Sequence, residues 1–245
     1  MKKQPKLILR ESAVLDMTRD VLPGSFVEMG AGTGHMAKIF LDRGFHGACH
    51  DIGESSRRIM RRRFSDFKEK IRVVDDISEL SEGEYDYLLA FEVLEHVLED
   101  RKVLQEWVRY LKPGGLLIAS VPAHQRKFGK SDEIVGHVRR YEKEHLRALL
   151  NSVELEDVKM INYGYPITEL TRALSNKIIA SDESYENLDQ KQRSIVSAQS
   201  KPKSIQKTLS FFGENLVTPF CYMQRWFYRW DFGDGLVATA KKKLT

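Results

Sequence analysis

Gly30, Gly32 and Gly34 stand at alternate positions directly after the apolar segment 25–29. Glycine permits positive φ angles and lets the backbone approach a ligand closely. The residues that follow have a helical pattern, and the free N–H groups at the start of a helix attract ligand oxygens. The spacing predicts a strand, a glycine-rich turn and a helix that bind a nucleotide. A tight turn with a purely structural role is the alternative.

Two kinds of nucleotide bind at such turns. The dinucleotide fingerprint GxGxxG needs its third glycine at position 35, but this chain has Gly34 followed by His35. Glu28, just before the turn, repels a pyrophosphate and attracts a ligand with an ammonium and a sulfonium charge. The residues favour such a cationic nucleoside over a dinucleotide, and they disfavour a nucleotide-dependent dehydrogenase.

Acidic residues follow the second and third predicted strands. Asp51 lies about twenty residues beyond the turn, where a carboxylate can accept hydrogen bonds from both ribose hydroxyls. Asp76 can accept from the amino group of an adenine, while the backbone N–H of Ile77 donates to the ring. A solvated loop position is the alternative for both acids, and Asp75 can exchange roles with Asp76.

The segment FEVLEH places Glu92, Glu95 and His96 within a short stretch after the fourth predicted strand. Histidine suits a general base near neutral pH, so His96 and Glu95 are candidate catalytic residues. The same three side chains also suit a divalent cation. A structural role for His96 is a third interpretation, and we favour a site without metal.

The segment GHVRRY follows the fifth predicted strand. His137 and Tyr141 are further candidate catalytic residues, and His137 or His124 can complete the ligands of a cation. Arg139, Arg140 and Tyr141 suit an anionic or hydroxylated acceptor. The alternative is that Tyr141 and one arginine cap the helix that follows.

Short apolar segments alternate with amphipathic ones along the chain. The predicted strands are 25–29, 47–50, 71–74, 85–90, 116–121, 158–163 and 236–240. The predicted helices are 10–22, 35–43, 55–70, 100–111 and 143–152. This alternation predicts an α/β fold with a doubly wound, mostly parallel sheet of seven strands. Right-handed crossovers place the carboxyl ends of its parallel strands at one edge, where ligands bind.

The pattern changes after residue 165. We expect an α/β core over 1–165, a largely helical insertion over 166–232, and a last strand with a basic tail over 233–245. The polar centre of the insertion, 181–204, is expected to be mobile. Nine aromatic side chains lie within 211–232, and three interpretations remain open for them. They pack on the sheet edge or on a second subunit in a homodimer, cover an apolar acceptor as a lid, or lie on a membrane surface.

Taken together, the motifs resemble the class I S-adenosylmethionine-dependent methyltransferases of the type 11/12 group. The resemblance rests on VEMGAGTG, the two acids after the second and third strands, YDYLLAFEVLEHV and LKPGGLLIASVP, over about residues 10–165. It implies a Rossmann-like fold, S-adenosylmethionine as cofactor and S-adenosylhomocysteine as product. The cofactor-binding residues that it implies are Glu28, Gly30, Ala31, Gly32, Gly34, Asp51, Ile52, Asp76, Ile77, Phe91 and Glu92.

The segment EVLEHV is similar to one in ubiquinone-biosynthesis and small-RNA 2′-O-methyltransferases, where it binds a divalent metal. In this chain the implied ligands are Glu92, Glu95, His96 and His137. Many relatives carry the same glutamate and histidine without a metal, so the resemblance keeps both interpretations open.

The composition excludes several classes of protein. With 245 residues, 42% hydrophobic and 30% charged, the chain is an ordinary globular protein, and its net charge of +4 does not favour nucleic acid as a partner. Cys49 and Cys221 cannot form a disulfide framework, so we expect a reducing compartment. No signal segment or membrane-spanning run is evident, since a span needs about 18 apolar residues. We expect a cytoplasmic protein, with peripheral contact at the inner face of the membrane as an extension of the aromatic interpretation.

We therefore predict a methyltransferase that acts on an oxygen or nitrogen nucleophile. Basic residues near the fifth strand, Arg126, Lys127 and Lys130, favour a phosphate, a carboxylate or a glycan on the acceptor. A small molecule, a glycan or a lipid-linked precursor is the expected acceptor class. The alternative is a non-catalytic scaffold that keeps the fold and binds a partner through its aromatic insertion.

Overall fold

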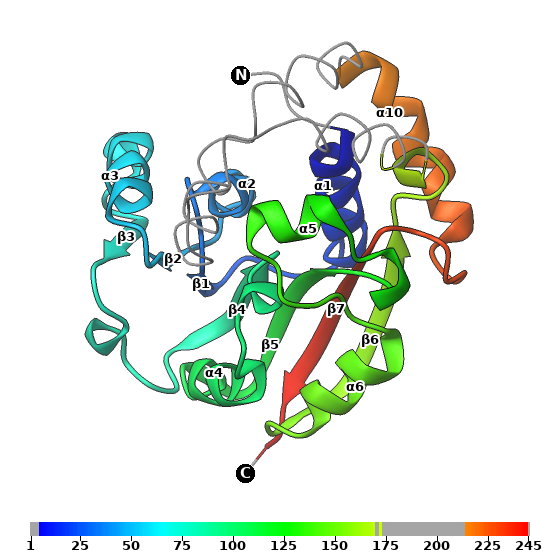
Figure 1. Ribbon diagram of the computed structural model, residues 1–245. Helices are drawn as coiled ribbons and strands as arrows, with labels where there is room; N and C mark the ends of the chain where they lie inside the picture. The colour runs from blue at the N-terminus through cyan, green and yellow to red at the C-terminus, as the bar shows by residue number, and fades with distance from the viewer. Residues whose placement is uncertain (1–4, 170–171, 173–213, 245) are drawn as a thin grey trace. The chain divides into compact units, whose positions relative to one another are not determined.

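A computed structural model describes residues 5–169, 172 and 214–244 of the chain, and its helices and strands are labelled in Figure 1. Seven strands form one sheet in the order β3-β2-β1-β4-β5-β7-β6. They are β1 (Ser25–Met29), β2 (His46–His50), β3 (Ile71–Val74), β4 (Tyr85–Phe91), β5 (Leu111–Pro122), β6 (Leu155–Tyr163) and β7 (Gly235–Lys242). The pairs β1–β2, β1–β4 and β2–β3 are parallel, and β7 runs opposite to β6 (Figure 1). The predicted α/β class and its seven strands are confirmed.

The described helices connect these strands. They are α1 (Pro5–Met17), α2 (His35–Asp42), α3 (Glu54–Arg63), α4 (Asp100–Val108), α5 (Lys130–Val135), α6 (Lys143–Asn151) and α10 (Glu214–Met223). Short 3₁₀ segments lie between them, among which η2 (Ile77–Glu79), η3 (Leu94–His96), η4 (Gln125–Lys127) and η5 (Gln224–Phe227) bear on function.

Several predicted boundaries were wrong. Helix α1 begins at Pro5 instead of residue 10, because proline fits the first turn of a helix, and it ends at Met17. Helix α4 ends at Val108, since the residues LKPGG belong to β5 and do not form a loop before it. Helix α5 was not predicted at all, because six residues are too few to show a helical period.

The chain forms two compact units, each made of separate stretches. The first unit contains Met1–Arg19, Ser120–Lys143 and Met160–Val237, and the second contains Asp20–Ala119, Glu144–Lys159 and Ala238–Thr245. The domain boundaries at 165 and 232 stay a prediction. The predicted mobility of 181–204 concerns residues that lie outside the described part of the chain.

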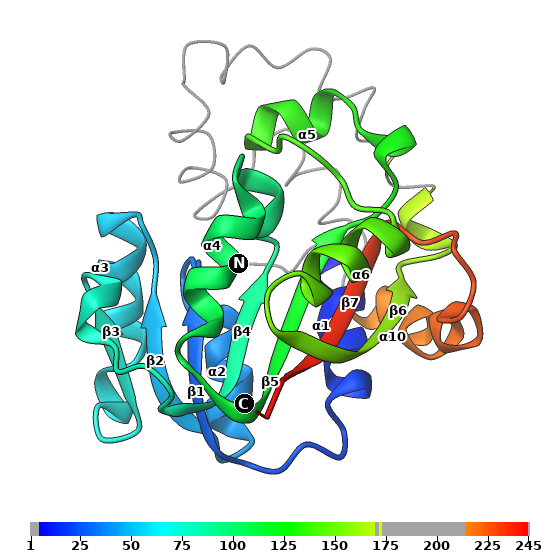
Figure 2. The same cartoon turned by 90° about the horizontal axis from the view of Figure 1, so that it is seen from below.

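Aromatic side chains form the core of the second unit. The ring of Phe40 on α2 lies 5.1 Å from that of Phe45, 6.2 Å from Phe26 on β1 and 6.3 Å from Phe91 at the end of β4. These contacts hold α2 against the central strands, and Figure 2 shows α4 on the opposite face of the sheet. Strands covered on both faces are rich in apolar residues, and β1 and β4 follow this rule except at Glu28 and Asp86.

In the first unit, helix α1 packs against α10. Gln224 donates from Nε2 to the carbonyl of Leu9 at 3.0 Å, and the carboxylate of Asp16 accepts from Arg225 at 2.7 and 2.8 Å and from Tyr228 at 2.8 Å. Trp226 beside these anchors is 78% exposed. The lid, dimer and membrane interpretations of the aromatic residues stay predictions, and Phe211 and Phe212 lie outside the described residues. Among the helices that the structure describes, none combines the length and the apolar character needed to cross a membrane.

Candidate functional site

The glycine turn of the second unit has the backbone conformation that its sequence predicts. Gly30, Gly32 and Gly34 have φ angles of +65°, +54° and +74°. A Cβ atom at Gly34 would lie 2.6 Å from Cζ of Phe64, and one at Gly30 would lie 2.6 Å from Cγ2 of Val93. Only glycine combines these φ angles with this lack of space, so the turn is fixed both by conformation and by packing.

The carboxylate of Asp51 holds this turn to the end of β2. Its Oδ2 accepts a hydrogen bond from the backbone N–H of Gly32 at 2.8 Å, and its Oδ1 accepts one from Gly53 at 2.8 Å. The side chain is only 6% exposed, and burial raises the pKa of Asp51 although these two hydrogen bonds oppose the shift. The backbone N–H of Ala31 also donates to the carbonyl of His50 at 3.0 Å. Each carboxylate oxygen keeps a second lone pair, so this structural role leaves room for the predicted ribose contact.

Next to this acid, Ile52 presents an apolar side chain that is 58% exposed. Its neighbour in the structure, Arg57, donates from Nη1 to the carbonyl of Asp51 at 2.6 Å and thereby fixes the backbone at this point. An exposed apolar side chain beside a carboxylate suits a ligand with a flat ring and a polyhydroxylated part.

The two acids after β3 have different partners. Asp75 forms ion pairs with Arg57 at 2.9 Å and Arg61 at 2.7 Å, which lower its pKa. Asp76 caps η2, where its Oδ1 accepts from the N–H of Ser78 at 2.8 Å, and hydrogen bonds from the side chain and the N–H of Ser78 lower the pKa of Asp76. Because Asp75 is engaged by two arginines, Asp76 is the better candidate for an adenine contact.

The residues around the end of β4 combine burial with an unusual backbone. Glu92 directly follows β4 and has a φ angle of +56°, which for a residue other than glycine costs about 1–3 kcal/mol. Glu95 in η3 is fully buried, and His96 closes the same 3₁₀ turn. On β1, Glu28 is also buried, opposite Cys49 of β2. Strained or buried carboxyl groups of this kind are concentrated at functional sites.

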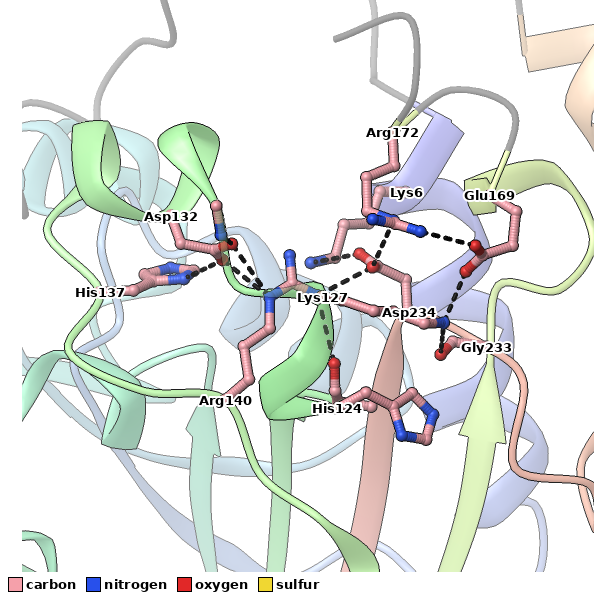
Figure 3. Close-up of polar contacts among 12 residues, drawn as sticks. Lys6, His124, Lys127, Asp132, His137, Arg140, Glu169, Arg172, Gly233 and Asp234 are labelled. Carbon is pink, nitrogen blue, oxygen red and sulfur yellow. Dashed lines mark hydrogen bonds and ion pairs between the residues drawn. The ribbon is translucent and has the colours of Figure 1, made fainter. Parts of the chain in front are cut away.

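The first unit holds the predicted residues His137 and Arg140 in a buried cluster of charges (Figure 3). Asp132 on α5 lies 2.9 Å from Nδ1 of His137 and accepts from Nε of Arg140 with both oxygens at 3.0 Å. Arg140 also donates from Nη1 to Asp234 at 2.8 Å and is 5% exposed. Burial opposes the ionisation of Asp132, but the hydrogen bond to His137 and the charge of Arg140 outweigh it and lower the pKa to about 2.

This ion-pair cluster extends to further residues of the first unit. The ammonium of Lys127 in η4 contacts Glu169 at 2.5 Å and the carbonyls of Phe232 and Gly233 at 2.8 Å each. Lys6 and Arg172 add positive charge beside Asp234 and Glu169 (Figure 3). Sequence analysis missed Asp132, Glu169 and Asp234, because nothing local distinguishes an acid that will be buried from one that stays in solvent. It also treated Lys127 as part of a basic loop, whereas Lys127 is buried.

Tyr141 lies beside the end of β5, where it pairs with Ala123, and its side chain is fully buried. Its N–H donates to the carbonyl of Pro122 at 2.9 Å, and its carbonyl accepts from the N–H of His124 at 3.0 Å. The structure therefore brings together the glycine turn with Asp51 in the second unit, and His137 with Arg140 in the first. The catalytic roles of Glu95, His96, His137 and Tyr141 stay predictions.

Known proteins share this architecture. Residues 5–160 match a family described as "Methyltransferase domain". Phosphoethanolamine N-methyltransferase 2 of Haemonchus contortus, solved with S-adenosyl-L-methionine, is 14% identical with a TM-score of 0.62 over 96% of this chain. This chain spans about half (52%) of the Haemonchus chain. A putative sarcosine dimethylglycine methyltransferase from Galdieria sulphuraria is 16% identical with a TM-score of 0.60, over 96% of this chain and 84% of that one.

A third similar structure is a possible histamine N-methyltransferase from Thermotoga maritima, 18% identical with a TM-score of 0.58, over 97% of this chain and 92% of that one. No curated protein sequence matches this chain. At these identities the structural likeness establishes a common fold.

Proposed function

This chain belongs to the methyltransferase domain family, and we propose that it is an S-adenosylmethionine-dependent methyltransferase. The proposal is carried by the left-handed glycine turn that the carboxylate of Asp51 holds against β2, beside the exposed Ile52. S-adenosylmethionine supplies an activated methyl group, which an acceptor oxygen or nitrogen takes by in-line attack with S-adenosylhomocysteine as the product.

The residues of the second unit fit this cofactor. The turn from Gly30 to Gly34 keeps positive φ angles at its glycines, and glycine lets backbone N–H groups approach a ligand closely. We assign the amino-acid end of the cofactor to Glu28, Gly30, Ala31, Gly32, Gly34, Phe91 and Glu92, and its nucleoside to Asp51, Ile52, Asp76 and Ile77. The carboxylate of Glu28 complements an ammonium or sulfonium charge, and it would repel a pyrophosphate.

For the acceptor, His137 is one candidate base, and Asp132 orients it. Asp132 accepts at Nδ1 of His137, which leaves the lone pair on Nε2. Nε2 can then take the proton that the nucleophile loses as its new bond to carbon forms. His96, Glu95 and Tyr141 remain further candidates. Transfer of a methyl group from a sulfonium is downhill, so positioning of the acceptor can supply much of the rate.

The acceptor class that we propose rests on a similar structure and on the exposed aromatic residues. A structure of the Haemonchus enzyme holds phosphomonomethylethanolamine with S-adenosylhomocysteine, so a small phosphorylated amine is one acceptor that this fold accommodates. We include glycans and lipid-linked precursors in the proposal because of the exposed aromatic side chains near η5, such as Trp226. A cytoplasmic location, contact with the membrane surface and a homodimer belong to the same proposal.

Calorimetry distinguishes an S-adenosylmethionine-dependent enzyme from a non-catalytic scaffold and from a dehydrogenase. We expect S-adenosylhomocysteine and S-adenosylmethionine to bind the intact chain at micromolar to low millimolar concentration, and NAD not to bind. A chain that binds neither sulfur compound at millimolar concentration would support the non-catalytic scaffold, and binding of NAD would support a dehydrogenase. Incubation with labelled S-adenosylmethionine and a panel of phosphorylated amines, glycans and lipid-linked sugars then identifies the acceptor by transfer of the label.

A further inference from the structure

His124 is a buried histidine that the proposed methyl transfer does not use. It follows β5 in the first unit, is only 3% exposed and has a φ angle of +66°. Its N–H donates to the carbonyl of Tyr141 at 3.0 Å, and its own carbonyl accepts from the N–H of Lys127 at 2.8 Å. Both backbone groups are therefore fixed, and in Figure 3 the imidazole points away from Arg140 and Asp132.

One side of this imidazole contacts a positioned carboxylate. Nδ1 of His124 lies 3.1 Å from Oε2 of Glu142, whose Oε1 accepts from the backbone N–H of Gln125 at 3.0 Å. Because a carboxylate only accepts hydrogen bonds, Nδ1 carries the proton, and Nε2 of the neutral imidazole carries the lone pair. A carboxylate that orients a histidine through the nitrogen opposite to a metal is the common arrangement in metalloproteins.

The other side of the imidazole has two acceptors facing each other. Nε2 of His124 is buried without a hydrogen-bond partner among the described residues, and it lies 3.8 Å from Oδ1 of Asp231. That distance is too long for a hydrogen bond. It is close to the separation of two ligands around an ion bound at about 2.0–2.2 Å from each. A cation beside Nε2 and the carboxylate of Asp231 would give Nε2 the partner that it lacks.

The surroundings of Asp231 decide which of its oxygens a cation can use. Lys143 reaches Oδ1 of Asp231 at 3.2 Å, and the amide of Asn162 donates to the same atom at 3.4 Å. Both groups occupy Oδ1, so a cation beside Nε2 of His124 binds the other oxygen of Asp231 or displaces the ammonium of Lys143. One ligand atom from each of His124, Glu142 and Asp231 lies within 4.8 Å of the others.

We propose that His124, Glu142 and Asp231 form a binding site for a divalent transition-metal ion of the zinc type. Nε2 of His124 and the carboxylate of Asp231 are the ligands, Glu142 orients the imidazole, and water completes the coordination. A mixed nitrogen and oxygen set selects ions such as Zn²⁺ or Co²⁺ over Mg²⁺ and Ca²⁺, which prefer oxygen alone. The site is distinct from the segment that contains His96, and it does not depend on the proposed methyl transfer.

Titration of the untagged, chelator-treated chain with Co²⁺ tests this proposal, with visible absorption reporting coordination and calorimetry with Zn²⁺ giving the affinity. We expect one ion per chain at this site and no competition by an equal concentration of Mg²⁺. The variants His124→Asn and Asp231→Asn are each expected to weaken binding at least tenfold. Asparagine tolerates the positive φ angle at position 124, so this exchange removes the imidazole with little backbone strain.

Two control variants separate this site from other histidines. His145→Gln changes an exposed histidine on α6, and His96→Gln changes the histidine of η3, and both are expected to bind Co²⁺ as the wild type does. Should His124→Asn fail to fold, the partly exposed Glu142→Gln is expected to weaken binding several-fold. No binding of Co²⁺ or Zn²⁺ at millimolar concentration, unchanged affinity in Asp231→Asn, or loss of binding in His96→Gln would each overturn the proposal.

Discussion

The glycine turn of the second unit and the ion-pair cluster of the first unit both remove polar groups from water, but they satisfy these groups differently. In the turn, one carboxylate, that of Asp51, accepts from two backbone N–H groups, and all the partners lie within residues 30–53. In the cluster, Arg140 and Lys127 are neutralised by Asp132, Glu169 and Asp234, which come from distant parts of the chain.

This difference bears on function. The turn leaves acceptor capacity on Asp51 and an exposed apolar side chain at Ile52, so it can receive a ligand. Arg140 is committed to two carboxylates and is buried, so this cluster stabilises the first unit and orients His137. A buried charge with all its partners is a poor ligand site, because a ligand would have to displace an existing ion pair.

The largest effect is expected from Arg140→Met. It leaves Asp132 and Asp234 buried without their shared partner, which typically costs about 3–5 kcal/mol in the free energy of unfolding. Urea unfolding followed by circular dichroism measures this loss. The matched control Arg139→Met removes the same charge one residue earlier and is expected to cost about 1 kcal/mol or less. Equal losses in the two variants would contradict the role of the cluster.

A smaller loss is expected from Gly34→Ala in the turn. The positive φ angle costs an alanine about 1–2 kcal/mol, and the contact with Phe64 adds to it, so we expect a loss of about 2–3 kcal/mol. Gly83→Ala is the control, since Gly83 has a φ angle of +64° but nothing within 4 Å of its Cβ position. Affinity for S-adenosylhomocysteine should fall only in Gly34→Ala. A similar fall in affinity in Gly83→Ala would show that the loss does not come from packing at the glycine turn.

Acid should weaken the cluster through Asp132. Its pKa in the folded chain, about 2, lies below its ordinary value of 3.8, so its stabilising contribution is complete above about pH 4 and is lost as the pH falls towards 2. The shift corresponds to about 2 kcal/mol. The difference in unfolding free energy between wild type and Asp132→Asn should therefore shrink between pH 5 and pH 2.5. A constant difference over this range would mean that the Asp132 carboxylate is not stabilised in the fold.

The smallest effect concerns ligand affinity. Asp51→Asn places an amide NH₂ against the N–H of Gly32 or Gly53, and should weaken S-adenosylhomocysteine binding by about 1–2 kcal/mol, roughly five- to thirtyfold. Asp75→Asn removes an exposed carboxylate that pairs with Arg57 and Arg61, and no measurable change in affinity is expected. Calorimetry with S-adenosylhomocysteine measures the affinity of both variants. Unchanged affinity in Asp51→Asn would show that the ribose lies elsewhere.

Sequence patterns predicted the region around the turn well. The bounds of β1 and β3 agree residue for residue, and the positive φ angles of the turn follow from its glycines. These features depend on short-range preferences, that is, on the conformational freedom of glycine and on the apolar character of strands covered on both faces. The hydrogen bond from the N–H of Gly32 to the carboxylate of Asp51 was not predicted, because an acid at position 51 suits a ligand equally well.

What the amino-acid sequence determined by itself is therefore the α/β class, the order of its seven strands along the chain and the conformation of the glycine turn. Only the tertiary structure decided that Arg140 and Lys127 are buried, that Asp132 orients His137, and that His124 faces Asp231. A charged side chain carries no local sign of its eventual partner. Whether it stays in water or pays for its desolvation with an ion pair depends on which distant residues the folded chain places beside it.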